Sequence, residues 1–221
     1  MPQPPSVSPG YRIATQEEKM DSESEVPEEA RKEVASAVRS AIAKHGYADL
    51  TTSQIAKETG KSEAFLFYHY DTKDDLVTAL LGDSIGWLDV RLELTADELK
   101  TPDERLRAMC DILLAIDTIE MMQGVHVAVM ELLSHAPHNE TLREPLERHQ
   151  AYIRDRLADE LRAGIEQGTY RKDIDPEASA SFLQMTLDGS TGSVLALGME
   201  GVGEETRDGI HTYIDSLMRE A

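Results

Sequence analysis

Hydrophobic residues recur every three or four positions along almost the whole chain after residue 27, which is the spacing of amphipathic helices. Between residues 28 and 46, for example, Val34, Val38 and Ile42 form one apolar stripe. No segment of strand length alternates between apolar and polar residues. The pattern therefore predicts an all-α protein.

The expected helix ends carry residues with known terminal preferences. Pro27 precedes two glutamates, which suits a helix start because carboxylates are favourable at the positive end of the helix dipole. Gly46, Gly60 and Gly168 are typical of helix ends. These signals predict about nine helices with short connections, at residues 28–46, 53–59, 63–70, 73–94, 102–122, 125–135, 139–167, 176–198 and 204–219.

Composition divides the chain into three regions. Residues 1–27 hold five prolines and an acidic stretch, and because such a segment buries little apolar surface we expect a disordered tail. Residues 28–76 hold short helices and residues 77–221 hold longer ones. We therefore predict a small N-terminal three-helix domain over 28–76 and a larger helical domain over 77–221.

The chain is strongly acidic, with 42 Asp and Glu against 22 Lys and Arg and a net charge of −20. Such a charge repels a polyphosphate at low salt. The acid is unevenly spread, since residues 28–76 hold seven basic and nine acidic residues and include five of the chain's eight lysines. The asymmetry predicts two functional regions, of which the N-terminal one tolerates an anionic partner better.

Several classes of protein are disfavoured by features that the chain lacks. No apolar run approaches the ~18 residues of a membrane span, and residues 1–10 lack the basic and apolar regions of a secretory signal. The single cysteine, Cys110, excludes an internal disulfide framework, and its apolar neighbours predict a buried, unreactive thiol. The chain holds no phosphate loop, nucleophile elbow or dinucleotide fingerprint. We expect a cytoplasmic protein that is not an enzyme and needs no cofactor, metal or membrane.

Residues 50–76 have the pattern of a helix-turn-helix, with two short helices joined by Gly60-Lys61-Ser62. The first helix is expected to bury Ile55 and Ala56, and the second to bury Leu66. The second helix also exposes an aromatic run: Phe67, Tyr68 and His69. Exposed side chains of this kind favour a helix lying in the major groove of DNA. On spacing alone, a three-helix packing unit without DNA contact explains the segment equally well.

A series of short motifs follows in order through this window: Gly46-Tyr47, Thr51-Thr52, Ile55-Ala56, Gly60-Lys61-Ser62, Leu66-Phe67-Tyr68-His69-Tyr70 and Lys73-Asp74-Asp75-Leu76. Together they make residues 31–81 resemble the N-terminal DNA-binding domain of the TetR/AcrR family of transcriptional regulators. Further along, Gly168, Asp175-Pro176-Glu177 and Asp188-Gly189 are similar to the family's pattern before and within its penultimate helix. Phe67 stands where the family usually has tyrosine, and Tyr68 beside it carries a phenol hydroxyl.

The resemblance implies a homodimeric repressor that binds a palindromic operator in double-stranded DNA. Helix 63–70 would lie in the major groove, with Lys73 on a phosphate. The implied DNA-binding residues are Thr51, Thr52, Ser53, Lys61, Ser62, Glu63, Ala64, Phe67, Tyr68, His69 and Lys73. The last two helices, 176–198 and 204–219, would pair with those of a second subunit.

The resemblance also implies a small-molecule effector of unknown identity, bound by the C-terminal domain. Methionine suits adaptable apolar sites, so a pocket between the middle helices is expected to include several. The candidate lining residues are Trp87, Met109, Leu113, Met121, Met122, His126, Met130 and Met185. Methionines at helical spacing fill the core more often than they line a pocket, and Trp87 can also be a core residue.

Two alternatives stay open from the sequence. One is a helical ligand-binding module with weak or lost DNA binding, which the net negative charge favours. The other is a metal sensor, because Glu131 and His135 share one helix face and His126 and His138 lie nearby in the sequence. Their spacing differs from the HExxH pattern, and we predict no metal ligand.

The acid excess with few lysines is similar to that of proteins from organisms that keep multi-molar salt in the cytoplasm. At such salt the screening length shrinks to a few ångströms, so a high net charge no longer repels DNA strongly. The chain therefore resembles a regulator from a halophilic archaeon, and an ordinary acidic protein from a mesophile is the alternative.

Overall fold

The computed structural model describes residues 27–96, 99–114, 120–199 and 201–219. Within these residues the chain forms nine α-helices and one 3-10 turn, with an isolated antiparallel bridge between Tyr170 and Met218. The helices are α2 (Glu28–His45), α3 (Thr52–Thr59), α4 (Glu63–His69), α5 (Lys73–Ala96), α6 (Pro102–Leu114), α7 (Glu120–His135), α8 (Glu140–Glu166), α9 (Pro176–Leu197) and α10 (Val202–Leu217), with η1 (Ala136–His138) before α8. The predicted all-α architecture is confirmed. The expected disorder of residues 1–27 lies outside the described residues, apart from Pro27.

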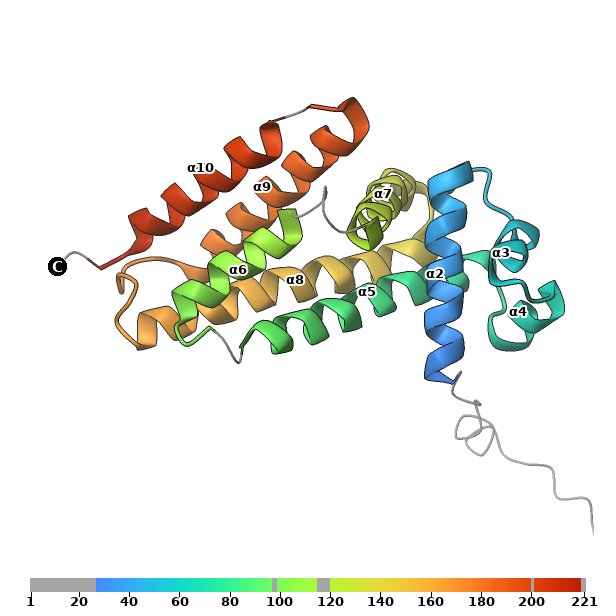
Figure 1. Cartoon of the computed structure of the whole chain (residues 1–221), viewed down its shortest axis with the longest axis horizontal. Helices are drawn as coiled ribbons and strands as arrows, with labels where there is room; N and C mark the ends of the chain where they lie inside the picture. Colours follow the sequence, from blue (N-terminus) through green and yellow to red (C-terminus); the bar gives the residue numbers. More distant parts are fainter. Residues whose placement is uncertain (1–26, 97–98, 115–119, 200, 220–221) are drawn as a thin grey trace, which may run out of the picture.

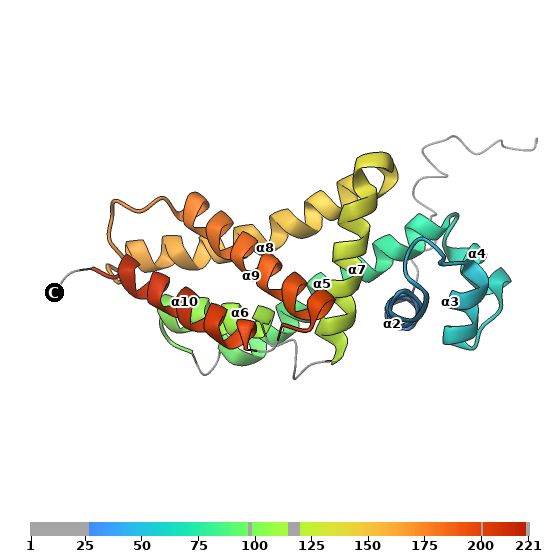
Figure 2. The ribbon, with the colours of Figure 1, turned by 90° about the horizontal axis from the view of Figure 1, so that it is seen from above.

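The molecule is elongated, with α3 and α4 at one end and the long helices α5 and α8 running away from them (Figure 1). Helix α2 crosses close to α3 and α4, and α9 and α10 lie side by side over the other half (Figure 2). The small N-terminal unit and the last two helices therefore occupy opposite parts of the molecule.

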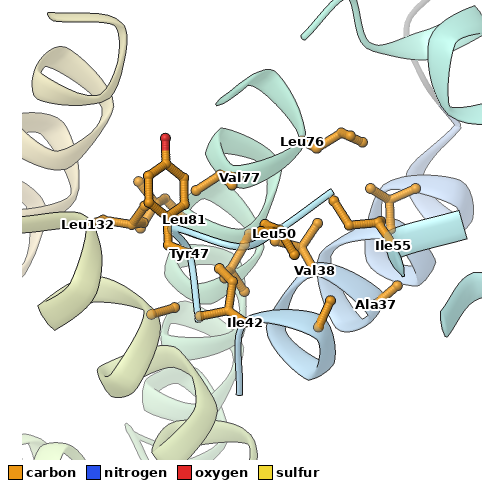
Figure 3. Packing of buried hydrophobic residues seen from close by; sticks show 14 of the residues in the cluster. Ala37, Val38, Ile42, Tyr47, Leu50, Ile55, Leu76, Val77, Leu81 and Leu132 are labelled. Atoms are coloured by element: carbon orange, nitrogen blue, oxygen red, sulfur yellow. The ribbon is translucent and has the colours of Figure 1, made fainter. Parts of the chain in front are cut away.

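One hydrophobic core holds the N-terminal helices together and joins them to α7. Ile42 of α2, Ile55 of α3 and Leu66 of α4 are almost completely buried, as the sequence predicts for the last two. Tyr47 in the loop after α2 packs in the same cluster as Leu132 of α7 (Figure 3). The helix-turn-helix unit is thus packed directly against the larger domain.

A second core fills the space between α6, α8, α9 and α10. Tyr170 is completely buried there, and its hydroxyl donates to Oδ1 of Asp103 at 3.1 Å. Cys110 is also completely buried, as predicted, and burial raises the pKa of its thiol to about 12. Leu88 places α5 in this core, while Leu81 places the same helix in the N-terminal core.

Gly124 does not interrupt a helix, although the sequence predicts a break there. It lies inside α7, which begins at Glu120. A Cβ atom at Gly124 would lie 2.6 Å from Cγ of Arg39 on α2. The glycine is therefore explained by the close passage of the Arg39 side chain, and Met121 and Met122 belong to α7 rather than to α6.

No helix in the described part of the chain combines the length and the apolar character that crossing a membrane requires.

Candidate nucleic-acid interface and ligand cavity

Helices α3 and α4 are both fixed at their starts by side-chain caps. The Thr51 hydroxyl accepts a hydrogen bond from the backbone N–H of Gln54 at 3.2 Å, and Oε1 of Gln54 accepts from the backbone N–H of Thr51 at 2.8 Å. The Ser62 hydroxyl caps α4 by accepting from the backbone N–H of Phe65 at 3.2 Å. Between them Gly60 takes the left-handed conformation, with φ of 66°. These local interactions stop α3 and restart the chain as α4.

The outer side of α4 carries two large aromatic side chains in solvent. Phe67 is 50% exposed and Tyr68 is 74% exposed. The Tyr68 ring meets the half-buried His69 ring edge to face at 4.7 Å. The other predicted contact residues on this unit are also accessible: Thr51, Ser53, Lys61, Ser62, Glu63 and Ala64 are exposed and Thr52 is half-buried. Together they form an accessible surface over α3 and α4.

The two lysines predicted to contact DNA lie in different settings. Lys61 lies in the exposed turn, with Nζ 3.4 Å from Oε1 of Glu33. Both side chains of this pair are exposed, so the pair holds Lys61 weakly. Lys73 is half-buried, donates from Nζ to the backbone oxygen of Tyr47 at 3.3 Å, and lies 4.3 Å from the centre of the Tyr47 ring. Of these two lysines, only Lys61 therefore has a solvent-exposed side chain.

Tyr47 connects the helix-turn-helix unit to the larger domain through several contacts. Its hydroxyl donates to Oδ1 of Asp74 at 2.7 Å, and Asn139 donates from Nδ2 to the other oxygen of Asp74 at 2.9 Å. Its ring lies 5.0 Å from that of His135, and its backbone N–H donates to Oε2 of Glu131. Burial and the Asp74 carboxylate raise the pKa of the Tyr47 hydroxyl well above its usual range.

The residues considered for metal binding do not converge. Glu131 and His135 both contact Tyr47 instead. Across the described residues, no group of three or more His, Cys, Asp or Glu side chains is arranged to hold a metal ion.

A cavity lies between α5, α6, α7, α8 and α9. Its lining residues are Ser84, Ile85, Leu88, Leu113, Val125, His126, Val129, His149, Gln150, Ile153, Gln184, Leu187 and Asp188. The cavity volume is about 30 Å³, which is room for one or two water molecules. Of the six predicted pocket residues whose side chains the structure describes, two, Leu113 and His126, line it.

The other predicted pocket residues lie elsewhere. Trp87 lines a groove between α2 and α5, and Met109 is buried in the second core. Met130 on α7 and Met185 on α9 are exposed. Gln184, Leu187 and Asp188 are the α9 residues that line the cavity, and Met185 lies on the outer side of that helix. Met121 and Met122 belong to α7, but their side chains are outside the described part of the structure.

Apart from His126, sequence reasoning missed the polar residues of the cavity. Ser84 donates to the backbone oxygen of Leu81 at 2.7 Å, so it can only accept from Nε2 of His149, which lies 3.1 Å away. His149 is therefore protonated at Nε2, and burial, with His126 nearby, lowers its pKa to about 4. Burial raises the pKa of Asp188 to about 6.

A signal for His149 is present in the sequence. Leu142, Leu146, Ile153 and Leu157 form the buried stripe of α8, and His149 occupies the remaining position of that stripe. A polar side chain within an apolar stripe indicates a buried polar contact.

The outer face of α9 is apolar and open. Phe182 is 51% exposed and Met185 is 61% exposed, and they are three residues apart on the helix. The Phe182 ring also lies 4.6 Å from that of Tyr213 on α10. This face therefore spans the last two helices.

Comparisons with known proteins agree with this arrangement. Residues 35–80 match the family model for bacterial regulatory proteins of the tetR family, and residues 102–219 match the model for the C-terminal region of BetI-type transcriptional repressors. The transcriptional repressor AcnR of Corynebacterium glutamicum is 26% identical over 180 residues, which are 80% of this chain and 89% of AcnR.

Solved structures share the fold. A TetR transcription regulator from Haloarcula marismortui is 31% identical with a TM-score of 0.74, and the match covers 86% of this chain and 98% of that one. A transcriptional regulator from Saccharomonospora viridis, solved in complex with choline, is 23% identical with a TM-score of 0.74 over 87% of this chain and 99% of that one, a likeness of fold alone. The matched C-terminal model and the identity to the Haloarcula protein show that this chain belongs to the TetR family of transcriptional regulators.

Proposed function

We propose that this protein is a ligand-responsive transcriptional repressor that binds a palindromic operator in double-stranded DNA as a homodimer. We place it in the cytoplasm and give it no catalytic step. The observation that carries the proposal is the accessible surface of α4, where Phe67 and Tyr68 lie in solvent on a capped helix of a helix-turn-helix. Large exposed aromatic side chains are costly in water and suit contact with base edges and thymine methyl groups.

The open apolar face of α9 supports a homodimer. Phe182 and Met185 expose a surface that a second subunit would cover, and α9 and α10 lie away from α3 and α4 (Figure 1). A two-fold axis at this face leaves both copies of α4 free to reach two half-sites.

Effector binding would reach DNA through α7. Val125 and Val129 of this helix line the cavity, and Glu131 and His135 of the same helix contact Tyr47 beside α3. Any effector larger than the present volume of about 30 Å³ has to displace a cavity wall. A displaced α7 would shift the Tyr47 loop, change the position of α4, and so favour release of the operator.

The test is binding of the purified protein to the duplex upstream of its own gene, followed by fluorescence anisotropy with a scrambled duplex as control. We expect specific binding, and its loss in Tyr68→Ala. Val90→Ala, which truncates an exposed apolar side chain on α5, is the matched control and should bind normally. Full affinity in Tyr68→Ala would contradict the docking of α4, and equal binding to both duplexes would contradict specific recognition of that duplex.

We further propose that the protein works at high salt. The net charge of −20 supports this, because strong screening removes the repulsion between an acidic protein and DNA. The same anisotropy experiment in KCl from low to multi-molar concentration tests it. Specific binding that persists at multi-molar KCl is expected, whereas binding confined to low salt would contradict the adaptation and leave the repressor proposal intact.

A further inference from the structure

The cavity between α5, α6, α7, α8 and α9 contains a buried hydrogen-bond acceptor that has no donor among the described residues. Nδ1 of His149 is completely shielded from solvent and has no partner among the described residues. Because Nε2 carries the proton and bonds to Ser84, Nδ1 is a lone-pair acceptor. A buried acceptor without a donor from the protein is costly, so Nδ1 favours a bound molecule that supplies a hydrogen-bond donor.

Two of the donors that line this cavity, Ser84 and Gln184, are already used within the protein. The Ser84 hydroxyl donates to Leu81, and the side-chain amide of Gln184 donates to the backbone oxygen of Gln150 at 2.9 Å and to its Oε1. These groups therefore have few hydrogens left for a bound molecule. A ligand that brings acceptors, such as a carboxylate, would find little to bond to here.

Asp188 adds a negative charge to the same cavity. Among the residues that the structure describes, no lysine or arginine forms an ion pair with it, and its side chain is half-buried. Burial raises its pKa to about 6, opposed by a hydrogen bond from Gln150, so the carboxylate is mostly ionised at neutral pH. A desolvated carboxylate is stabilised by a cation that carries N–H donors.

The other side chains that line the cavity indicate which kind of cation fits. They are aliphatic, with Ile85, Leu88, Val129, Ile153 and Leu187 among them. Of the described residues that line the cavity, none is phenylalanine, tyrosine or tryptophan. Quaternary ammonium groups have no N–H and are usually held by aromatic cages, so this lining does not suit them. The cavity thus differs in its requirements from a site for choline.

We propose that the effector is a primary or secondary organic ammonium, whose N–H groups bond to Asp188 and His149 and whose hydrocarbon part lies against the aliphatic walls. This inference rests on the proposed ligand-responsive function and names the chemical class of the effector. The Asp188 carboxylate determines the charge of the ligand, and the unpartnered Nδ1 of His149 requires a hydrogen-bond donor. The absence of an aromatic cage among the described lining residues separates this class from quaternary ammonium compounds.

Isothermal titration calorimetry of the full-length protein with three probes tests the proposal. The probes share one hydrocarbon chain: n-hexylammonium, n-hexyltrimethylammonium and 1-hexanol. We expect n-hexylammonium to bind about tenfold or more tightly than either of the others, because only it combines charge with N–H donors. Equal or tighter binding of the trimethylammonium compound, or of the alcohol, would overturn the proposal.

Two variants separate the cavity from the general acidity of the chain. Asp188→Asn removes the carboxylate with little change of shape, and we expect it to abolish the preference for n-hexylammonium. Glu147→Gln removes one charge from the exposed side of α8 and should keep the preference. A preference that survives in Asp188→Asn would show that the ammonium binds elsewhere and would overturn the assignment. The comparison of probes on the unaltered protein decides the ligand class even if a variant fails to fold.

Operator binding tests the repressor function, and the preference for n-hexylammonium tests the ligand class, so the two proposals can fail separately. Specific operator binding together with no preference for n-hexylammonium would overturn the ligand class alone. A preference for n-hexylammonium without specific operator binding would support the ligand class and contradict the repressor. Release of a bound operator duplex by n-hexylammonium, and not by 1-hexanol, is the outcome expected if both hold.

Discussion

Gly164 is a residue whose missing side chain matters for stability. A Cβ atom at this position of α8 would overlap with Cδ2 and Cε2 of Tyr170, whose ring is completely buried and whose hydroxyl is bonded to Asp103. Because the ring has no room to retreat, Gly164→Ala should lower the free energy of unfolding by roughly 1–3 kcal/mol. Urea unfolding at fixed protein concentration measures this. Gly82→Ala is the control, because a Cβ atom added at Gly82 of α5 meets no other atom within 4 Å, and it should raise the free energy of unfolding by up to about 1 kcal/mol. Equal effects of the two changes would contradict the close packing of Tyr170 against Gly164.

His149 makes stability depend on pH. Its pKa is lowered from 6.5 to about 4 on folding, so below pH 6.5 the unfolded chain takes up a proton that the folded chain does not. The folded state is therefore favoured above about pH 6.5 and loses stability as the pH falls towards 4. We expect the difference in unfolding free energy between the wild type and His149→Gln to shrink by roughly 2 kcal/mol between pH 7.5 and pH 5.

Urea unfolding at the two pH values gives that difference, and other titrating groups cancel in it. The control is His138→Gln, which alters an exposed histidine in η1 and should leave the pH profile close to that of the wild type. A difference that stays constant with pH for His149→Gln would mean that the imidazole is not buried in its neutral form.

At the scale of elements, α4 depends on its cap because it is only seven residues long. Ser62→Ala removes the acceptor for the backbone N–H of Phe65, which should cost about 1 kcal/mol and fray the first turn. Operator affinity should then fall by about fivefold, measured by anisotropy. Ser62→Asn restores a capping acceptor and is expected to recover most of the affinity. If Ser62→Asn is as weak as Ser62→Ala, the serine acts by contacting DNA and not as a cap.

The helix pattern was readable because local rules govern it. The apolar period, the glycine ends and Pro27 place most helices within a residue or two of their observed bounds, as for the predicted helix 139–167 and α8. Gly124 was misread because its reason is tertiary: the side chain of Arg39, on another helix, needs the space. A single sequence shows that a glycine is present but not which neighbour requires it.

The helix-turn-helix surface was easier to predict from the sequence than the cavity, because its residues lie close together along the chain. The helix-turn-helix surface lies within about twenty residues of sequence, so its motifs appear together. The cavity brings Ser84, His149 and Asp188 from three helices far apart in the chain. Methionines were expected there from their chemistry, but which helix faces meet depends on packing between helices, and Met185 lies on the outer side of α9.

At the scale of the whole molecule, no loose linker separates the helix-turn-helix from the ligand cavity. Helix α5 contributes Leu81 to one hydrophobic core, Leu88 to the other and Ser84 to the cavity wall. Helix α7 joins the same two places through Val129 and Glu131. Since both helices pack in the N-terminal core and also line the cavity, we expect a movement of the cavity wall to be transmitted as a rigid displacement rather than absorbed by a flexible loop.

The distribution of charge over the molecule determines how DNA binding responds to salt. Lys61 lies in the turn before α4, and its exposed pair with Glu33 is weak enough to be exchanged for a phosphate. Lys172 is exposed in the segment between α8 and α9, at the opposite end of the molecule from α4 (Figure 1). Each lysine-to-glutamine change makes the net charge more negative by the same amount, so both variants repel DNA equally at long range.

In a plot of log affinity against log KCl concentration, Lys61→Gln should reduce the slope by about one per subunit, because one phosphate contact is lost. Lys172→Gln should keep the wild-type slope, and identical slopes for the two variants would mean that the turn before α4 does not touch the DNA backbone.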